Sequence, residues 1–161
     1  MPAIHHLLHT LSAELLSRKL KLVTAESCTG GMIAAACTDL AGSSHWFECG
    51  FVTYSNAAKE RDLGVSAQIL NAHGAVSEAT VKAMVAGAAR YGDVSIAVSG
   101  IAGPGGAVAG KPIGTVWIGC GNEEVQRVSL FHFDGDRDAV RQNSAAKALE
   151  MLLDFVNGSD H

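Results

Sequence analysis

The sequence predicts one three-layer α/β/α domain over residues 1–161, with a mixed, mainly parallel sheet and a late antiparallel hairpin. A length of 161 residues suits one hydrophobic core. Helical and strand-like segments alternate through the first two thirds of the chain, as in α/β proteins. Two strand-like segments then follow one another, and Gly121-Asn122 between them is a hairpin signal.

Apolar spacing and turn residues place the individual elements. Apolar residues at helical spacing predict a helix over 3–18, and β-prone residues predict strands over 20–26 and 46–54 with an alanine-rich helix, 30–40, between them. The segment AAKERDLG predicts a short helical turn. Serine caps predict helices from Ser66 to Ala72 and from Ser77 to Tyr91, the second ended by Gly92. The remaining predictions are strands over 94–101, 113–120 and 124–133 and a last helix from Gly135-Asp136 to about Val156.

Composition excludes several classes of protein. Hydrophobic content of 48% argues against disorder, and a net charge of −4 argues against a protein built to hold nucleic-acid phosphates. No apolar run reaches the length of a membrane span, and the N-terminus lacks the pattern of a signal peptide. We therefore expect a cytoplasmic protein with neither a nucleic-acid nor a membrane partner.

Cysteine and histidine spacings predict no metal site. Four cysteines, none in a CxxC pair, indicate free thiols in a reducing compartment. His5 and His9 lie one helical turn apart, but no third ligand follows them.

The segment from Leu20 to Leu40 contains a candidate nucleophile. Ser27 stands between a strand and a helix, where free backbone N–H groups could hold an oxyanion; the candidates are those of Cys28, Thr29 and Gly30. Gly30 and Gly31 leave the backbone open to a ligand. The alternative is that Ser27 or Thr29 is only a helix cap.

The only long glycine-rich stretch follows the predicted strand 94–101. Residues 105–111 match the GxxxxGK signature of a P-loop, but Pro112 stands where Ser or Thr should bind magnesium, and a strand follows instead of a helix. Backbone amides at Gly103, Gly105 and Gly106 could still contact an anion. The alternative is a flexible loop at the sheet edge.

Tyr54 and Lys59 are the candidate partners of Ser27. Both follow the second strand, and the histidines have no sequence context that ties them to Ser27. A lysine can act as the base where burial favours its neutral form, and a tyrosine can pass the proton. The alternative is that Lys59 is a solvated charge.

Six short blocks in order resemble the C-terminal domain of the competence/damage-inducible protein CinA. The blocks are Ala25–Gly31, Tyr54–Lys59, Gly74–Ser77, Ser99–Gly106, Lys111–Val116 and Gly135–Arg137. The resemblance covers about the whole chain. It implies a mixed-sheet α/β/α domain that forms homodimers, and hydrolysis of the carboxamide of nicotinamide mononucleotide to nicotinate mononucleotide and ammonia in pyridine-nucleotide salvage.

Within this resemblance, Ser27 corresponds to the nucleophile, and Tyr54 and Lys59 assist it by Ser-Lys catalysis. The reaction needs no cofactor. Candidate contacts to the nucleotide substrate are Gly31, Asn56, the loop glycines Gly103, Gly105 and Gly106, Arg137 and Arg141. Two alternatives stay open: a catalytically silent nucleotide- or partner-binding module, and an amidase for another small carboxamide.

Overall fold

A computed structural model describes residues 2–158, which form a five-stranded sheet with helices on both faces. Residues 1 and 159–161 of the expected domain lie outside the described residues. The strands are β1 (Leu22–Glu26), β2 (Phe47–Val52), β3 (Val94–Gly100), β4 (Thr115–Gly121) and β5 (Gln126–His132). The helices are α1 (Pro2–Arg18), α2 (Met32–Thr38), α3 (Asn56–Leu63), α4 (Ala67–His73), α5 (Glu78–Ala89) and α6 (Arg137–Val156), with a 3-10 turn over Ser43–His45.

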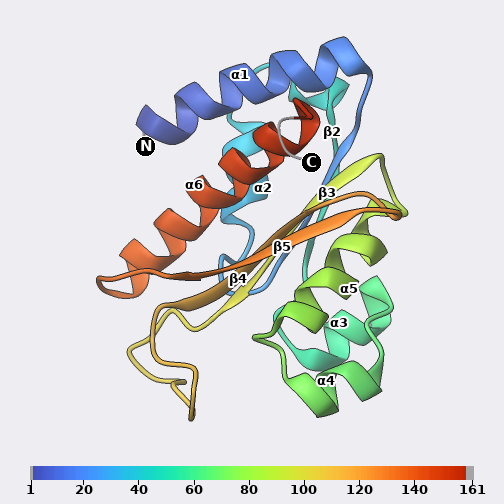
Figure 1. The fold of residues 1–161 in the computed structure, drawn as a ribbon. Coiled ribbons are helices and arrows are strands. Elements are labelled where there is room, and N and C mark those ends of the chain that lie inside the picture. The colour runs from blue at the N-terminus through green and yellow to red at the C-terminus, as the bar shows by residue number, and fades with distance from the viewer. Residues whose placement is uncertain (1, 159–161) are drawn as a thin grey trace.

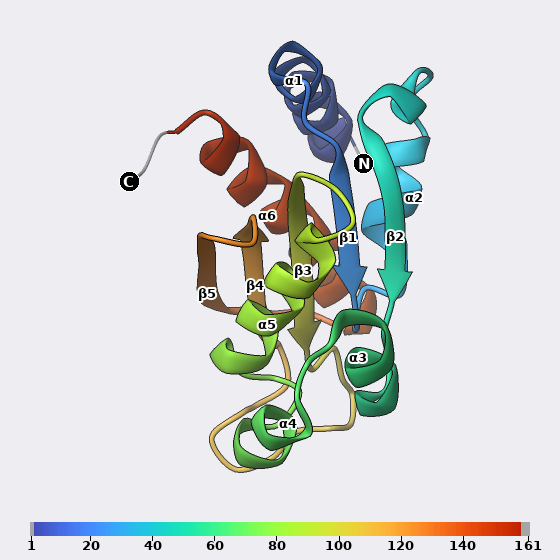
Figure 2. The ribbon, with the colours of Figure 1, turned by 90° about the vertical axis from the view of Figure 1, so that its right-hand side faces the viewer.

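The strand order is β2-β1-β3-β4-β5, as Figure 2 shows. Strand β1 pairs in parallel with β2 and β3, whereas β4 is antiparallel to both β3 and β5. The sheet is therefore mixed and mainly parallel, as predicted: β1, β2, β3 and β5 run in the same direction, and β4 runs in the opposite one. The physical reason is the loop between β3 and β4, which contains no crossover helix of the kind that parallel neighbours need.

The three predicted layers are confirmed. Helices α1, α2 and α6 lie on one face of the sheet, and α3, α4 and α5 lie on the other (Figure 1). Each face has its own apolar cluster: Leu8, Leu11 and Leu15 of α1 belong to the first, and Val81, Met84 and Val85 of α5 to the second. Both clusters follow from helical spacing of apolar residues.

Most helix starts agree with the sequence, and several ends do not. Ser66, Ser77 and Asp136 each accept a backbone N–H as N-cap. Helix α5 ends earlier than predicted, because Arg90 and not Gly92 is its C-cap. Helix α2 starts at Met32 rather than at residue 30, since Gly30 and Gly31 have positive φ values of 61° and 102°.

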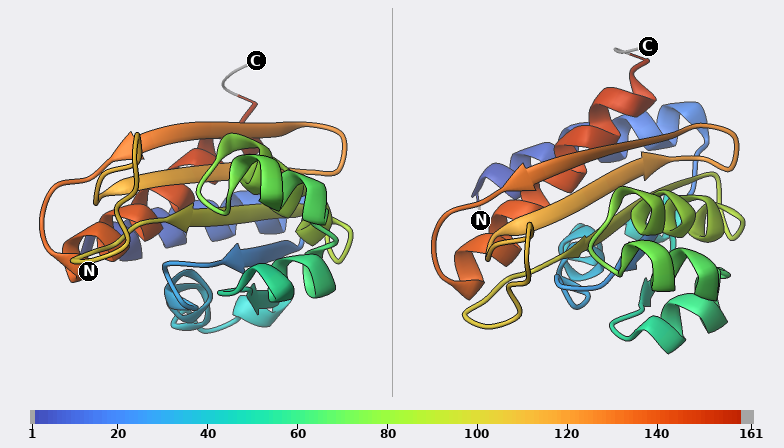
Figure 3. Two further views of the ribbon diagram at one scale, coloured as in Figure 1. Left: turned by 90° about the horizontal axis from the view of Figure 1, so that it is seen from below. Right: turned by 60° about the horizontal axis from the view of Figure 1, so that its bottom comes forward.

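The predicted site residues follow the carboxyl ends of the parallel strands, which all lie at the same end of the sheet. The parallel strands β1, β2 and β3 all finish there, and β5 leads from the same end into α6. Figure 3 shows the loop after β3 extending beside the start of α6. Among the described residues, no helix is both long and apolar enough to cross a membrane.

Candidate active site

Ser27 continues β1 by one residue and remains in the sheet ladder. Its N–H donates to the Val98 carbonyl at 3.0 Å. Because Val23 and Ala25 pack in the apolar cluster beneath α5, alternation along the strand turns the Ser27 side chain to the same face. Ser27 is 8% exposed, so its hydroxyl lies just below the surface.

Lys59 reaches Ser27 from the first turn of α3. This helix begins at Asn56 because the hydroxyl of its N-cap, Ser55, accepts the Ala58 N–H. Helical side chains point back toward the N-terminus, which brings the Lys59 amine to the end of β2. Its Nζ lies 2.8 Å from the Thr53 carbonyl oxygen, 3.2 Å from that of Tyr54 and 3.1 Å from Ser27 Oγ.

In these three contacts Nζ donates to Ser27 Oγ and to the two carbonyls, which accounts for all three N–H groups of an ammonium. In the neutral form, two N–H groups serve the carbonyls and the lone pair can accept the Ser27 hydroxyl proton. The side chain is 0% exposed, and no carboxylate within residues 2–158 pairs with it. Burial lowers the Lys59 pKa from 10.5 to about 8, partly offset by the Cys28 thiol. The positive end of the α3 dipole also disfavours an ammonium there.

The Glu26 carboxylate accepts backbone N–H groups at the start of α2, which would otherwise be free to bind an anion. Glu26 is 1% exposed, and it accepts the N–H groups of Ile33 at 2.9 Å and Ala34 at 3.0 Å. The first-turn amides of α2 are therefore engaged, and an oxyanion must be held by the turn that precedes the helix. The sequence did not reveal this role, although a carboxylate at the end of a buried strand before a helix was a visible signal.

The turn from Ser27 to Gly31 leaves some amides open. The Gly30 N–H donates to the Ser27 carbonyl at 3.0 Å, so it is engaged within the turn and not available as the expected oxyanion donor. Among the described residues, the amides of Cys28 and Thr29 donate to no other carbonyl. They are the expected oxyanion donors that remain.

Arg141 of α6 holds this turn from the other side. Its Nε donates to the Cys28 carbonyl at 3.0 Å, and an Nη donates to the Thr29 carbonyl at 3.2 Å. The sequence indicates Arg141 as a candidate substrate contact. In the structure its guanidinium binds the backbone of the turn, across 113 residues of sequence.

Tyr54 contributes to the site in two different ways. Its carbonyl faces inward, 3.2 Å from Lys59 Nζ and 3.5 Å from Ser27 Oγ. Its side chain is 62% exposed, and its hydroxyl lies 3.4 Å from an Nη of Arg137. Lys59 contacts Ser27 directly, without this hydroxyl as an intermediary.

Arg137 joins the tyrosine to the glycine-rich loop. Its other Nη donates to the Gly103 carbonyl at 2.8 Å. The remaining candidate substrate contacts make no hydrogen bond to Ser27 or Lys59 within residues 2–158. Gly31 is the N-cap of α2 and lies beside Val52, whereas Asn56, Gly105 and Gly106 are exposed.

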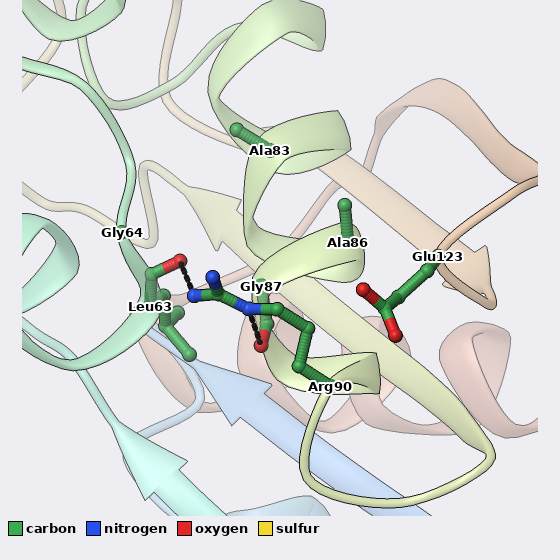
Figure 4. Close-up of a pocket in the computed structure, with 7 residues that line it drawn as sticks. All are labelled: Leu63, Gly64, Ala83, Ala86, Gly87, Arg90 and Glu123. Carbon is green, nitrogen blue, oxygen red and sulfur yellow. Dashed lines mark hydrogen bonds between the residues drawn. The ribbon is translucent and has the colours of Figure 1, made fainter.

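Two other features carry none of the predicted chemistry. Burial raises the Cys28 pKa to about 11, so its thiol does not compete as a nucleophile. Within residues 2–158, no three His, Cys, Asp or Glu residues are grouped to hold a metal ion. A cavity of about 260 Å³ lies between α3 and α5, and neither Ser27 nor Lys59 lines it. Figure 4 shows its lining, where Arg90 donates to the carbonyls of Leu63 and Gly87.

Comparison with known proteins identifies the family of this chain. The family model of the CinA C-terminal domain matches residues 4–156. The chain belongs to this family. The resemblance expected from the six sequence blocks is therefore confirmed.

Members of the CinA C-terminal domain family are similar over nearly the whole chain. The nicotinamide-nucleotide amidohydrolase PncC of Enterobacter agglomerans is 49% identical over 153 residues, which cover 93% of this chain and 93% of that protein. The protein of the same name from Escherichia coli strain K12 is 49% identical over 139 residues, 84% of each chain. The crystal structure of the competence damage-inducible protein A from Klebsiella pneumoniae subsp. pneumoniae MGH 78578 has a TM-score of 0.93 at 37% identity, and covers 98% of this chain and 99% of that one.

Proposed function

We propose that this protein hydrolyses the carboxamide of nicotinamide mononucleotide to nicotinate mononucleotide and ammonia, a step of pyridine-nucleotide salvage. The observation that carries the proposal is the buried Lys59 amine 3.1 Å from Ser27 Oγ, beside a turn with open amides. The names of the two PncC relatives support the choice of substrate. The amide needs a nucleophile, a base and an oxyanion site, so no cofactor enters the proposal.

The reaction begins with proton transfer from Ser27 to the neutral Lys59 amine. Ser27 Oγ forms a bond to the carboxamide carbon, and the carbonyl oxygen becomes an oxyanion held by the turn amides. The Lys59 ammonium then protonates the nitrogen, the C–N bond breaks, and ammonia leaves. Water, deprotonated by the same amine, attacks the acyl-enzyme, and Ser27 recovers its proton as the acid product departs.

Arg141 acts on the oxyanion through the backbone. In a trans peptide the C=O and N–H point in opposite directions. Since the guanidinium binds the Cys28 carbonyl, the Thr29 N–H of the same peptide unit points away from Arg141. This orients the dipole before the reaction starts, so little reorganisation is needed when charge develops.

The exposed side chains of Tyr54 and Arg137, the rim of the site, are proposed to bind the nucleotide beside the buried residue Gly103. Arg137 is the first residue of α6, a 20-residue helix, and two of its nitrogens contact the protein at 2.8 and 3.4 Å. The helix dipole and the guanidinium both favour an anion there, and the ribose phosphate is the anionic group of the substrate. The homodimer stays a prediction.

Ammonia release from nicotinamide mononucleotide tests the proposal directly. Purified wild-type protein should release ammonia, and Ser27→Ala should abolish release while its circular dichroism spectrum and melting temperature stay near those of wild type. Ser144→Ala is the control, because Ser144 is a buried serine bonded within α6 to the Val140 carbonyl.

Three results would contradict the proposal in different ways. Unchanged release from Ser27→Ala would exclude Ser27 as the nucleophile. Wild-type protein that binds the nucleotide by calorimetry without turnover would support the silent binding module instead. If ammonia were released from another carboxamide but not from nicotinamide mononucleotide, the substrate assignment would be wrong and the other carboxamide would replace it.

A further inference from the structure

Ser99 lies beside Ser27 at the end of the neighbouring strand. The parallel register pairs Ala25 with Ala97 and Glu26 with Val98. The bond from Ser27 N to the Val98 carbonyl at 3.0 Å continues that ladder, so Ser27 stands opposite Ser99. Neighbouring strands are about 5 Å apart, and residues in register point to the same face.

The same face also carries Lys59, but from the other side of Ser27. Lys59 Nζ binds the carbonyls of Thr53 and Tyr54, which follow β2. Because β1 lies between β2 and β3, the amine and the Ser99 hydroxyl flank the Ser27 hydroxyl along one edge. The next residue in the row is Trp117 of β4, which packs against the apolar cluster beneath α5.

The Ser99 hydroxyl hydrogen-bonds to no side chain or carbonyl within residues 2–158, although the residue is only 1% exposed. Ser95, four residues earlier on the same face of β3, donates its hydroxyl to the Val85 carbonyl at 2.7 Å. Within residues 2–158, the fully buried side-chain oxygens without a partner are those of Thr24, Thr29 and Thr53, so the Ser99 oxygen keeps some access and can accept a hydrogen bond from a ligand.

We propose that Ser99 recognises the amide nitrogen of the substrate by accepting one of its N–H groups, an assignment that rests on the proposed function. The carbonyl oxygen is directed to the amides of the turn, and the nitrogen must lie near Lys59 to be protonated. A hydroxyl on the same face then meets the remaining N–H. As the nitrogen gains positive charge in the transition state, this hydrogen bond becomes charge-assisted and strengthens.

An ester substrate separates this role from a structural one. The methyl ester of nicotinate mononucleotide keeps the carbonyl that Ser27 attacks but has no N–H to offer Ser99. Wild type, Ser99→Ala and Ser95→Ala would each be assayed with the amide and with the ester. The ratio of the two kcat/KM values on one preparation does not depend on the fraction of folded enzyme.

The amide-to-ester ratio should fall roughly 3- to 10-fold in Ser99→Ala, mostly through kcat for the amide, as expected for one lost hydrogen bond. It should stay at the wild-type value in Ser95→Ala. A ratio unchanged in Ser99→Ala, with wild type active on both substrates, overturns the assignment of Ser99 alone. Wild type that hydrolyses the ester but releases no ammonia from the amide overturns the proposed function, and the Ser99 assignment with it.

Discussion

Two neighbouring regions of the site differ in burial and in contacts. One is the buried pair of Ser27 and Lys59, and the other is the exposed rim of Tyr54 and Arg137. Lys59 is 0% exposed and Ser27 is 8% exposed, whereas the Tyr54 side chain is 62% exposed. Three oxygens lie within 3.2 Å of the Lys59 amine, while the Tyr54 hydroxyl has one contact at 3.4 Å. Burial of the pair lowers the Lys59 pKa, and exposure of the rim leaves room for a large polar ligand.

One short segment serves both regions. Tyr54 turns its carbonyl inward to the amine and its ring outward to the rim. In the proposed function, bond breaking and nucleotide binding are therefore separated by burial and not by distance along the chain. We therefore expect substitutions at the pair to act on kcat and substitutions at the rim to act on KM.

The largest effect should follow removal of the base. Lys59→Ala should lower kcat for ammonia release by about 10²- to 10⁴-fold, the usual contribution of a positioned base. Steady-state kinetics with nicotinamide mononucleotide measures it, and Lys82→Ala, an exposed lysine on α5, is the matched control. A loss below tenfold would remove Lys59 from the role of base.

The pH profile should report the same amine. Only the neutral form accepts the Ser27 proton, and the Lys59 pKa is lowered to about 8, so kcat/KM should rise with pH and level off above that value. Measurement of kcat/KM from pH 6 to 10, roughly two units either side of the pKa, gives the midpoint. Activity that falls on raising the pH through 8 would mean that the protonated amine is the active form.

Arg141→Gln tests whether the turn must be held in place. Loss of the two contacts to the Cys28 and Thr29 carbonyls should lower kcat by up to about 10²-fold, because small displacements of catalytic dipoles are costly. Lys147→Ala is the control on the same helix, since that amine contacts Glu150 and the Phe131 ring and not the turn. If KM rises and kcat is unchanged, Arg141 belongs with the rim as a substrate contact.

The smallest effect on turnover should come from the rim. Arg137→Ala should raise KM roughly tenfold, as for one charged hydrogen bond, with kcat changed less than about threefold. Because a phosphate contact is ionic, the difference between wild type and variant should shrink as salt is added. A kcat loss comparable to that of Lys59→Ala would end the division between pair and rim.

Local patterns determined the elements and several of their starts. Ser66, Ser77 and Asp136 cap the helices that their positions predicted, since a cap acts on amides two or three residues away. Apolar spacing identified the buried faces of α1 and α5. The positions of Ser27 and Lys59 in the sequence, together with the family resemblance, predicted that these two residues are partners.

Only the tertiary structure decided how these residues are used. Ser27 meets Lys59 across 32 residues of sequence, and Cys28 meets Arg141 across 113. Strand order and register decide three further features: the hydrogen bond of the Gly30 amide, the binding of the Glu26 carboxylate to the first amides of α2, and the position of Ser99 beside Ser27. Local sequence encodes neither the order nor the register, because a hydrogen bond between distant residues exists only once the backbone brings its donor and acceptor within about 3 Å.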